Sequence, residues 1–360
     1  MSAEEESASL APQIQNSPNT ATSKVTIYDI AHAAGVNAST VSRALGKKGR
    51  TAPRTQKLIE DIATELGYRV NPFARALPTG RTYLLGLIVG NVVDPSFLDV
   101  IRCAESTATA HGYNLILVGT PEAPEKEIAT IQRIKGGVDG LILADPLMCD
   151  DQLREMSRDT PLVVIDRQTE GIPCVVPDVK KGVREAIRGL RENGHRKVAF
   201  VSGARDSWMS TRIGAEVQDA CEWSGMEAIG IPSREPTVEG GRLTARNVVA
   251  SGATAVLTCN DLLAIGLMQE LQAASITVPD RMSIVGFGDA VGSVYTTPQL
   301  TTVRWNRGQT GTNAINLLVE ILDASGTPAR AVHLDTEVVI RGSIGRQNNA
   351  PSWLEVEAHD

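Results

Sequence analysis

The sequence predicts a small N-terminal domain of the helix-turn-helix kind, followed by a larger α/β body built on parallel sheets. Three observations predict this fold. Two short amphipathic helices separated by a glycine lie within residues 25–46. From residue 83, short runs of Val, Ile and Leu alternate with helical stretches, which is typical of parallel sheets covered on both faces. The body of about 260 residues favours two sheets over one.

The first helix and the turn after it carry clear local signals. Thr26 with Asp29 three residues later is a capping-box pattern, and Gly35 supplies the turn. Asn37 is a favourable N-cap for the second helix. Apolar residues at helical spacing predict a buried stripe on the first helix: Ile27, Ile30, Ala31 and Ala34.

The second helix has one apolar face and one face that is small and polar. Val41 and Leu45, four residues apart, are expected to point inward. The outward positions end in an arginine: Ala38, Ser39, Ser42 and Arg43. A solvated surface helix of this length would usually carry more Glu and Lys, so this face predicts entry into the major groove of DNA.

A third helix completes the domain. Pro53 fits its first position, and Gly67 is the expected C-cap. Its predicted apolar face consists of Leu58, Ile59, Ile62, Ala63 and Leu66.

In the body, candidate strands are 84–89, 114–118, 140–144, 162–165, 198–201, 255–258 and 283–286. Helices are expected near 97–110, 125–135, 180–193, 211–224, 240–250 and 262–273. Open parallel sheets bind ligands at the carboxyl ends of their strands. Several polar residues fall there: Asn91, Asp94, Asp166, Asn260, Asp261 and Asp289.

Charge is unevenly distributed along the chain. Residues 24–81 hold ten Lys and Arg against four Asp and Glu, a net charge of +6 within a chain whose total is −7. A basic domain on an acidic body is the electrostatic pattern of a DNA-binding module. A solvated loop would explain Lys47, Lys48 and Arg50, but not the confinement of positive charge to one segment.

Composition and motifs argue against other classes. The five cysteines are dispersed, and we expect no signal peptide, membrane span or metal site, with the protein reduced and cytoplasmic. No phosphate-binding glycine loop or nucleophile elbow is present, so no catalytic residues, metal or cofactor are predicted. His195, on a helix-to-strand turn, is expected to be structural.

Several distinct short motifs lie along the chain. In the first part they are Val25–Ala31, Ala34–Val36, Ser39–Arg43, Leu66–Tyr68, Asn71, Ala74–Leu77 and Thr79–Arg81. Later ones are Asp94–Phe97, Gly194–Phe200, Asn260–Asp261, Ser283–Phe287 and Leu300–Val303. Together they resemble the LacI/GalR family of bacterial transcription regulators over roughly residues 24–345.

The resemblance implies a domain organisation. It comprises a disordered extension (1–23), the helix-turn-helix domain (24–70), a hinge helix and linker (71–82), an effector-binding and dimerisation domain (83–345) and a flexible tail (346–360). The large domain would be two doubly wound lobes of the periplasmic-binding-protein type, joined by three crossovers, with the effector in the cleft.

The resemblance also implies contacts with DNA. Arg43 is suited to a guanine, with Ala38 and Ser39 selecting neighbouring bases. The hinge between Pro72 and Pro78 should fold only on DNA, where Leu77 wedges into the minor groove. Backbone contacts are expected from Thr26, Tyr28, Thr40, Ser42, Tyr68 and Asn71.

In the effector cleft the resemblance is weaker. Ile213 and Gly288 stand where the family has an arginine and an aspartate, so Arg212 and Asp289 would substitute one residue out of register. The candidate effector-binding residues are Asn91, Asp94, Phe97, Asp166, Trp208, Arg212, Asn260 and Asp289. Trp208 and Trp305 are equally compatible with the core. We therefore expect free monosaccharides to bind weakly and the effector to be larger, or flatter and less polar; repression without an effector stays open.

The sequence thus predicts a homodimeric DNA-binding transcriptional regulator, a repressor of an inverted-repeat operator, gated by a small molecule such as a sugar derivative. The alternative is a cytoplasmic small-molecule sensor whose N-terminal domain serves another partner. An enzyme on a doubly wound fold has no supporting motif.

Overall fold

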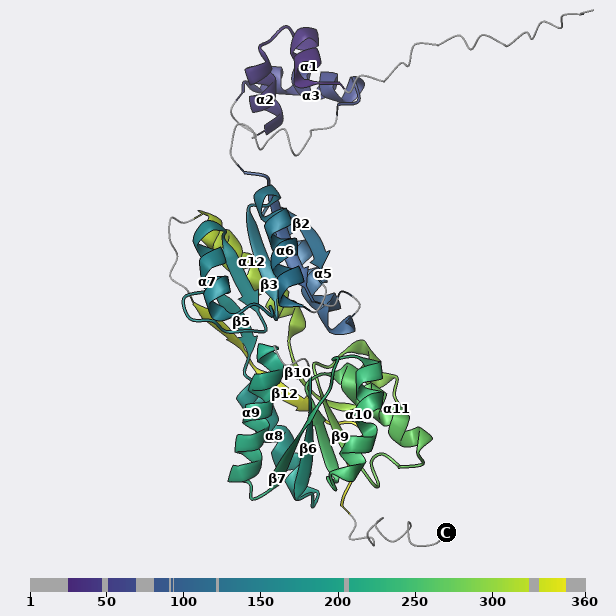
Figure 1. The fold of residues 1–360 in the computed structure, drawn as a ribbon. Coiled ribbons are helices and arrows are strands. Elements are labelled where there is room, and N and C mark those ends of the chain that lie inside the picture. The colour runs from purple at the N-terminus through teal and green to yellow at the C-terminus, as the bar shows by residue number, and fades with distance from the viewer. Residues whose placement is uncertain are drawn as a thin grey trace, which may run out of the picture. The chain divides into compact units, whose positions relative to one another are not determined.

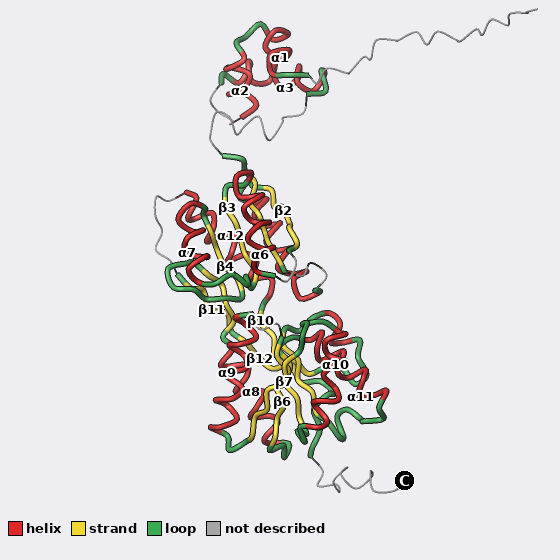
Figure 2. The backbone as a smooth tube through the Cα atoms, in the orientation of Figure 1, coloured by secondary structure: helices red, strands yellow, loops and turns green. Residues whose placement is uncertain are grey.

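The computed structural model describes residues 25–46, 51–68, 81–90, 92, 94–120, 123–203, 207–323 and 330–347. The chain divides into two compact units, Met1–Pro78 and Thr79–Asp360, whose elements are drawn in Figures 1 and 2. The expected extension 1–23, the hinge as far as residue 80 and the tail from residue 348 lie outside the described residues. So do three predicted contact residues: Asn71, Leu77 and Asn91.

The first unit contains three helices, α1 (Ile27–Ala34), α2 (Ala38–Gly46) and α3 (Pro53–Glu65). They enclose a core in which Ile30, Val41 and Ile59 are fully buried. The predicted capping box is present, because the Asp29 carboxylate accepts hydrogen bonds from both the backbone N–H and the hydroxyl of Thr26, each at 2.7 Å. Gly35 has φ 63°, the left-handed turn conformation that glycine adopts without strain.

The apolar face of α3 is narrower than predicted. Ile59 and Ala63 are buried and Ile62 packs beside them, but Leu58 is 47% and Leu66 39% exposed. A core shared by three short helices has room for one stripe only, and Leu58 lies one residue off that stripe. Leu66 would continue the stripe, but the helix has already ended there.

Lobe 1 of the second unit has a sheet of order β11-β5-β4-β3-β1-β2, with every described pairing parallel. Its strands are β1 (Leu84–Val89), β2 (Asn114–Gly119), β3 (Gly140–Ala144), β4 (Leu162–Ile165), β5 (Cys174–Pro177) and β11 (Ala331–Leu334). One face is covered by α5 (Leu98–Ala110) and α12 (Arg307–Asp323), the other by α6 (Pro124–Ile134) and α7 (Asp150–Asp159). Two short 3-10 helices also belong here, η1 (Pro95–Phe97) and η2 (Lys135–Gly137).

Lobe 2 has a sheet of order β12-β10-β9-β8-β6-β7. Its strands are β6 (Lys197–Ser202), β7 (Glu227–Pro232), β8 (Ala255–Thr258), β9 (Ser283–Phe287), β10 (Thr301–Trp305) and β12 (Thr336–Val339). Its helices are α8 (Val179–Glu192), α9 (Trp208–Trp223), α10 (Val238–Ala250), α11 (Asp261–Ala273) and η3 (Val291–Val294). The expected all-parallel sheet is mixed here, because the edge strand β12 pairs antiparallel with β10.

The chain passes between the lobes three times, after β5, after β10 and after β11, as the resemblance implied. One buried apolar cluster extends through both lobes beside these passages. His195 is structural, as expected: it is 1% exposed, and its ring nitrogens contact the Thr254 hydroxyl at 2.9 Å and the Gly345 carbonyl at 3.1 Å. No helix in the described part of the chain is long and apolar enough to cross a membrane.

Candidate DNA-binding face and effector cleft

The outward face of α2 presents Ser39, Ser42 and Arg43, all exposed. The Arg43 Nε donates a hydrogen bond of 3.2 Å to the carbonyl of Ser39 one turn earlier, which holds the side chain along the helix. Ala38 was expected on this face but is half-buried and packs against the core.

The other described candidates for DNA contact are spread around this unit. Thr26 is exposed and Tyr28 is 71% exposed, an unusual position for a large aromatic side chain. Thr40 is half-buried, and Tyr68 packs against the core.

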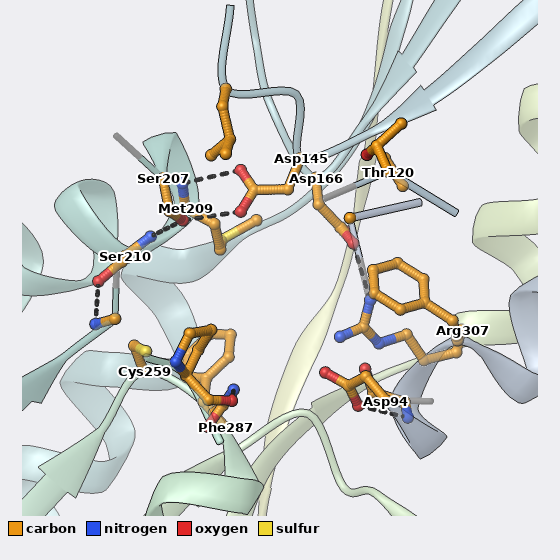
Figure 3. A pocket seen from close by; sticks show the side chains of 18 of the residues that line it. Asp94, Thr120, Asp145, Asp166, Ser207, Met209, Ser210, Cys259, Phe287 and Arg307 are labelled. Atoms are coloured by element: carbon orange, nitrogen blue, oxygen red, sulfur yellow. Dashed lines mark hydrogen bonds and ion pairs between the residues drawn. The ribbon is translucent and has the colours of Figure 1, made fainter. Parts of the chain in front are cut away.

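The second unit contains a cleft between the two lobes, drawn in Figure 3. It encloses about 140 Å³. Its walls include residues that follow β1, β3 and β4 in lobe 1 and β6 and β8 in lobe 2, the strand ends where ligand sites are expected. The main polar and aromatic lining residues are Asp94, Phe97, Thr120, Glu127, Asp145, Asp166, Ser207, Asn260, Phe287, Trp305 and Arg307.

Arg307 dominates one side of this cleft. It is the first residue of α12, directly after the passage from β10, and its Nη1 pairs with Asp166 Oδ2 at 2.8 Å. Its guanidinium lies 3.8 Å from the centre of the Trp305 ring and 5.6 Å from that of Phe97. Burial raises the pKa of Asp166, and the charge of Arg307 opposes that shift.

Asp145 follows β3, the strand next to β4 from which Asp166 extends, and Figure 3 shows its carboxylate directed at Ser207 of lobe 2. The Ser207 hydroxyl donates to Asp145 Oδ2 at 2.7 Å, and the Met209 N–H contacts Oδ1 at 3.5 Å. Burial raises the pKa of Asp145 to about 7, and the nearby charge of Asp166 adds to this. The hydrogen bonds from Ser207 and Met209 and the charge of Arg167 oppose this shift without cancelling it.

The loop that carries Asp145 is held by two buried charged residues. Glu127 accepts a hydrogen bond of 2.9 Å from the Leu147 N–H. Arg167 donates to the carbonyls of Pro146 and Met148, each at 2.6 Å. Burial raises the pKa of Glu127, and the backbone N–H groups of Leu147 and Met148 together with the charge of Arg167 oppose that shift.

Asp94 and Asn260 line the cleft while also capping helices. The Asp94 carboxylate accepts from the Ser96 N–H at 2.8 Å. Asn260 accepts from the Leu263 N–H at 2.9 Å and donates to the Pro236 carbonyl at 2.8 Å. Their roles in the fold are therefore settled by these bonds, independently of any ligand.

Three of the predicted effector residues do not line the cleft. Arg212 pairs with Glu216 at 2.7 Å, and Asp289 pairs with Arg341 at 2.6 Å. Trp208 is partly buried against the core, whereas Trp305 does line the cleft. Arg307, which was not predicted, lines the cleft and pairs there with Asp166, which was, so the cleft holds a charged pair although Arg212 and Asp289 lie outside it.

The sequence reasoning also missed Asp145 and Arg307. Asp145 directly follows the predicted strand 140–144, so the strand-end rule that singled out Asp166 would have found it. Arg307 gave no such signal, because neither β10 nor α12 was predicted. Within the described ranges, no group of three or more His, Cys, Asp or Glu is placed to hold a metal ion.

Two family descriptions match this chain: "Bacterial regulatory proteins, lacI family" over residues 26–71 and "Periplasmic binding protein-like domain" over residues 187–344. The chain is 30% identical over 341 residues to the HTH-type transcriptional repressor PurR of Vibrio parahaemolyticus, covering 90% of this chain and 99% of that protein. This chain belongs to the LacI family. Catabolite control protein A of Streptococcus mutans is 29% identical over 331 residues, covering 89% of this chain and 98% of that protein.

Solved structures agree on the fold. A lac repressor dimer bound to operator and the anti-inducer ONPF has a TM-score of 0.80 at 21% identity, covering 89% of this chain and 99% of that one. A complex of the regulator CelR with cellobiose has a TM-score of 0.66 at 24% identity, with 89% and 99% covered. A LacI-family regulator of Enterococcus faecalis with bound ribose has a TM-score of 0.67 at 22% identity, with 74% and 100% covered.

Membership in the LacI family confirms the predicted class. The relatives are transcription regulators, so this LacI-family protein is a DNA-binding transcriptional regulator gated by an effector, and not an enzyme. The predicted architecture, a helix-turn-helix domain with a two-lobed periplasmic-binding-protein-like domain, is confirmed as well.

Proposed function

We propose that this LacI-family regulator is a repressor that binds an inverted-repeat operator as a homodimer, in the compartment that holds the DNA. The exposed face of α2, with Arg43 flanked by small polar residues, supports major-groove contact. The relative named a repressor and the structure of a lac repressor dimer on its operator support the mode of action and the dimer. In this proposal the DNA-binding domain is residues 24–70, the hinge is residues 71–82 and the effector domain is residues 83–345.

We further propose that the effector binds in the cleft between the lobes. The observation that carries this is the meeting of both lobes around one small space: lobe 1 contributes the charged side chains Asp145, Asp166 and Arg307, and lobe 2 contributes Ser207, Asn260 and Trp305. A ligand that touches both walls would bias the relative positions of the lobes. Of the predicted residues, Asp94, Phe97, Asp166 and Asn260 fit this role.

The size of the cleft also bears on the effector. Its volume of about 140 Å³ is well below the roughly 300–1,000 Å³ of sites for drug-sized ligands. That supports a small effector, whereas the sequence suggested one that is larger, or flatter and less polar. Relatives with bound ribose and cellobiose favour a polyhydroxylated molecule.

Selection of duplexes from a random library by the full-length protein tests the DNA part of this proposal. We expect an enriched inverted repeat, bound as a dimer by sedimentation, with an affinity that falls steeply as salt concentration rises. A double variant, Ser39→Ala with Arg43→Ala, changes only exposed side chains and should lose the enrichment. Enrichment of a single half-site, or of nothing, would contradict the proposal. Transcription from a promoter carrying the selected repeat should rise when the gene is deleted.

A further inference from the structure

The cleft carries an excess of acidic groups. Among its described lining residues, the ionisable side chains with a formal charge are Asp94, Glu127, Asp145, Asp166 and Arg307. Four carboxyl groups therefore share one guanidinium within a single small space.

The one cation is already engaged. Arg307 pairs with Asp166 at 2.8 Å, and its guanidinium lies over Trp305 and near Phe97. Both side chains of the ion pair are nearly buried, at 13% and 5% exposed. The Arg307 Nε has no hydrogen-bond partner among the described residues, but an anion placed there would lie beside Asp166 and the remaining carboxyl groups.

The other three carboxyl groups are held by hydrogen bonds from neutral donors. Asp94 accepts from the Ser96 N–H, Glu127 from the Leu147 N–H, and Asp145 from the Ser207 hydroxyl. These bonds supply no positive charge, and Arg167, whose charge also acts on Glu127 and Asp145, is itself paired with Asp150. The negative charge of the cleft is therefore left for a ligand or for protons to offset.

A second, independent observation points to a ligand. The Oδ1 atom of Asp166 is buried and has no hydrogen-bond partner in the described part of the chain, although its Oδ2 is paired. Buried acceptors are nearly always satisfied, and an exception calls for a missing donor. Asp166 lines the cleft, so a donor group of the bound effector is the candidate for this partner.

We propose that the effector is a small polyhydroxylated molecule bearing a protonated amine, and that the cleft selects this cation over neutral and anionic molecules of the same size. A neutral hydroxyl would satisfy Asp166 Oδ1 but would leave the excess carboxyl charge in place. A protonated amine does both, because charge-assisted hydrogen bonds to a carboxylate are the stronger kind. The proposal rests on the assignment of the cleft as the effector site.

Calorimetric titration with three ligands on one ring tests it: glucosamine, glucose and glucuronate, with the galactose series as a repeat. At a pH of about 7 we expect the amine to bind at least about tenfold tighter than the neutral sugar, a difference of about 1.4 kcal/mol. The anion should bind more weakly than the neutral sugar. Equal affinity for amine and neutral sugar, tightest binding of the anion, or a Kd weaker than about 10 mM for both amines would overturn the proposal.

Two variants test which carboxyl groups produce the selectivity for the amine over the neutral sugar. Asp166→Asn should reduce the ratio of amine to neutral affinity by about tenfold. Glu127→Gln should reduce this ratio less. This second variant keeps the test available if Asp166→Asn does not fold. Glu222→Gln, at an exposed position on α9 away from the cleft, should leave the ratio unchanged. An unchanged ratio in both cleft variants would also overturn the proposal.

The outcome separates this inference from the proposed function. If the protein binds its operator and a neutral sugar releases it while amines fail, the proposed function stands and the charge selectivity does not. If amines bind selectively but no duplex is enriched, the cleft inference stands and the operator proposal fails.

Discussion

The carboxylate of Asp145 accepts a hydrogen bond of 2.7 Å from the hydroxyl of Ser207, and this contact joins the two lobes across the cleft. Asp145 follows β3 in lobe 1, whereas Ser207 is the N-cap of α9 in lobe 2. The same Ser207 oxygen accepts from the Ser210 N–H at 3.1 Å, so one side chain both caps a helix and bridges the lobes. A change in the charge of Asp145 should therefore affect stability and interlobe geometry together.

Asp145 makes the stability of the second unit dependent on pH. Burial raises its pKa to about 7 from the ordinary value of 3.8. Between these values the folded protein keeps a proton that the unfolded chain has lost, so the free energy of unfolding falls as pH rises through this window and levels off above it. The full difference corresponds to at most about 4 kcal/mol, and access of water to the cleft reduces it.

Asp145→Asn should remove this pH-dependent contribution, because the amide does not titrate. Urea denaturation gives the free energy of unfolding of both proteins between pH about 4 and 8. The quantity to follow is the variant's free energy of unfolding minus that of the wild type at each pH. We expect this difference to shift in favour of the variant as pH rises. Parallel pH profiles of the two proteins would show that Asp145 titrates normally.

The ion pair between Arg307 and Asp166 leads to a second prediction. Arg307→Met leaves the Asp166 carboxylate buried without its cation, and removing one partner of a buried pair costs about 3–5 kcal/mol. The double variant, Arg307→Met with Asp166→Asn, should recover much of this loss, since no unpaired charge remains. Denaturation without ligand checks both. A double variant no more stable than Arg307→Met alone would rule out the unpaired charge as the cause.

Close contact between α10 and α11 gives a third prediction. A Cβ on Gly266 of α11 would collide with the carbonyl of Val238 at the start of α10. Gly266→Ala should therefore cost about 1–3 kcal/mol or more, because backbone atoms must move apart. The matched control is Gly189→Ala in α8, where a Cβ would meet nothing within 4 Å and should stabilise the helix by about 0.5–1 kcal/mol. Similar thermal midpoints for the two variants would contradict the close approach.

The sequence predicted best those elements whose pattern is set by burial alone. Strands β1, β3, β4 and β8 were expected at their observed bounds, because each is a short, buried and mostly apolar run. Five strands were not predicted: β5, β7, β10, β11 and β12. Three of them, β7, β11 and β12, are edge strands with partly exposed side chains. Helices α7 and α12 were missed as well: the first is mostly polar, and the second has Gly308 and Gly311 in its first turns.

The elements that were not predicted determined which cleft residues the sequence identified. Asp166 and Asn260 follow strands that were predicted, and both line the cleft. Arg307 begins α12 just after β10, so without these elements the positive charge was sought at Arg212, which instead pairs with the buried carboxylate of Glu216 one turn along α9. Which of two neighbouring helix residues faces a cleft depends on helix rotation, and one sequence does not fix that rotation.

The last prediction concerns Arg43. Its side chain is exposed on the outer face of α2, where a guanidinium can donate two parallel hydrogen bonds to one guanine. Arg43→Ala should weaken binding to the selected operator by roughly 1–3 kcal/mol and relax base preference at one position in each half-site. Gel-shift titration against single-base variants of the operator measures both effects.

The way in which affinity falls across the operator variants distinguishes a contact of Arg43 with a base from a contact with a phosphate. A phosphate contact would weaken every operator variant alike and lower the salt dependence, whereas a base contact abolishes the preference at one position and leaves the others intact. Arg54→Ala, in the first turn of α3, is a control for loss of one positive charge from the same domain. It should change affinity without changing base preference. If Arg43→Ala kept every base preference of the wild type, another residue of α2 would have to be the reader, with exposed Ser39 the next candidate.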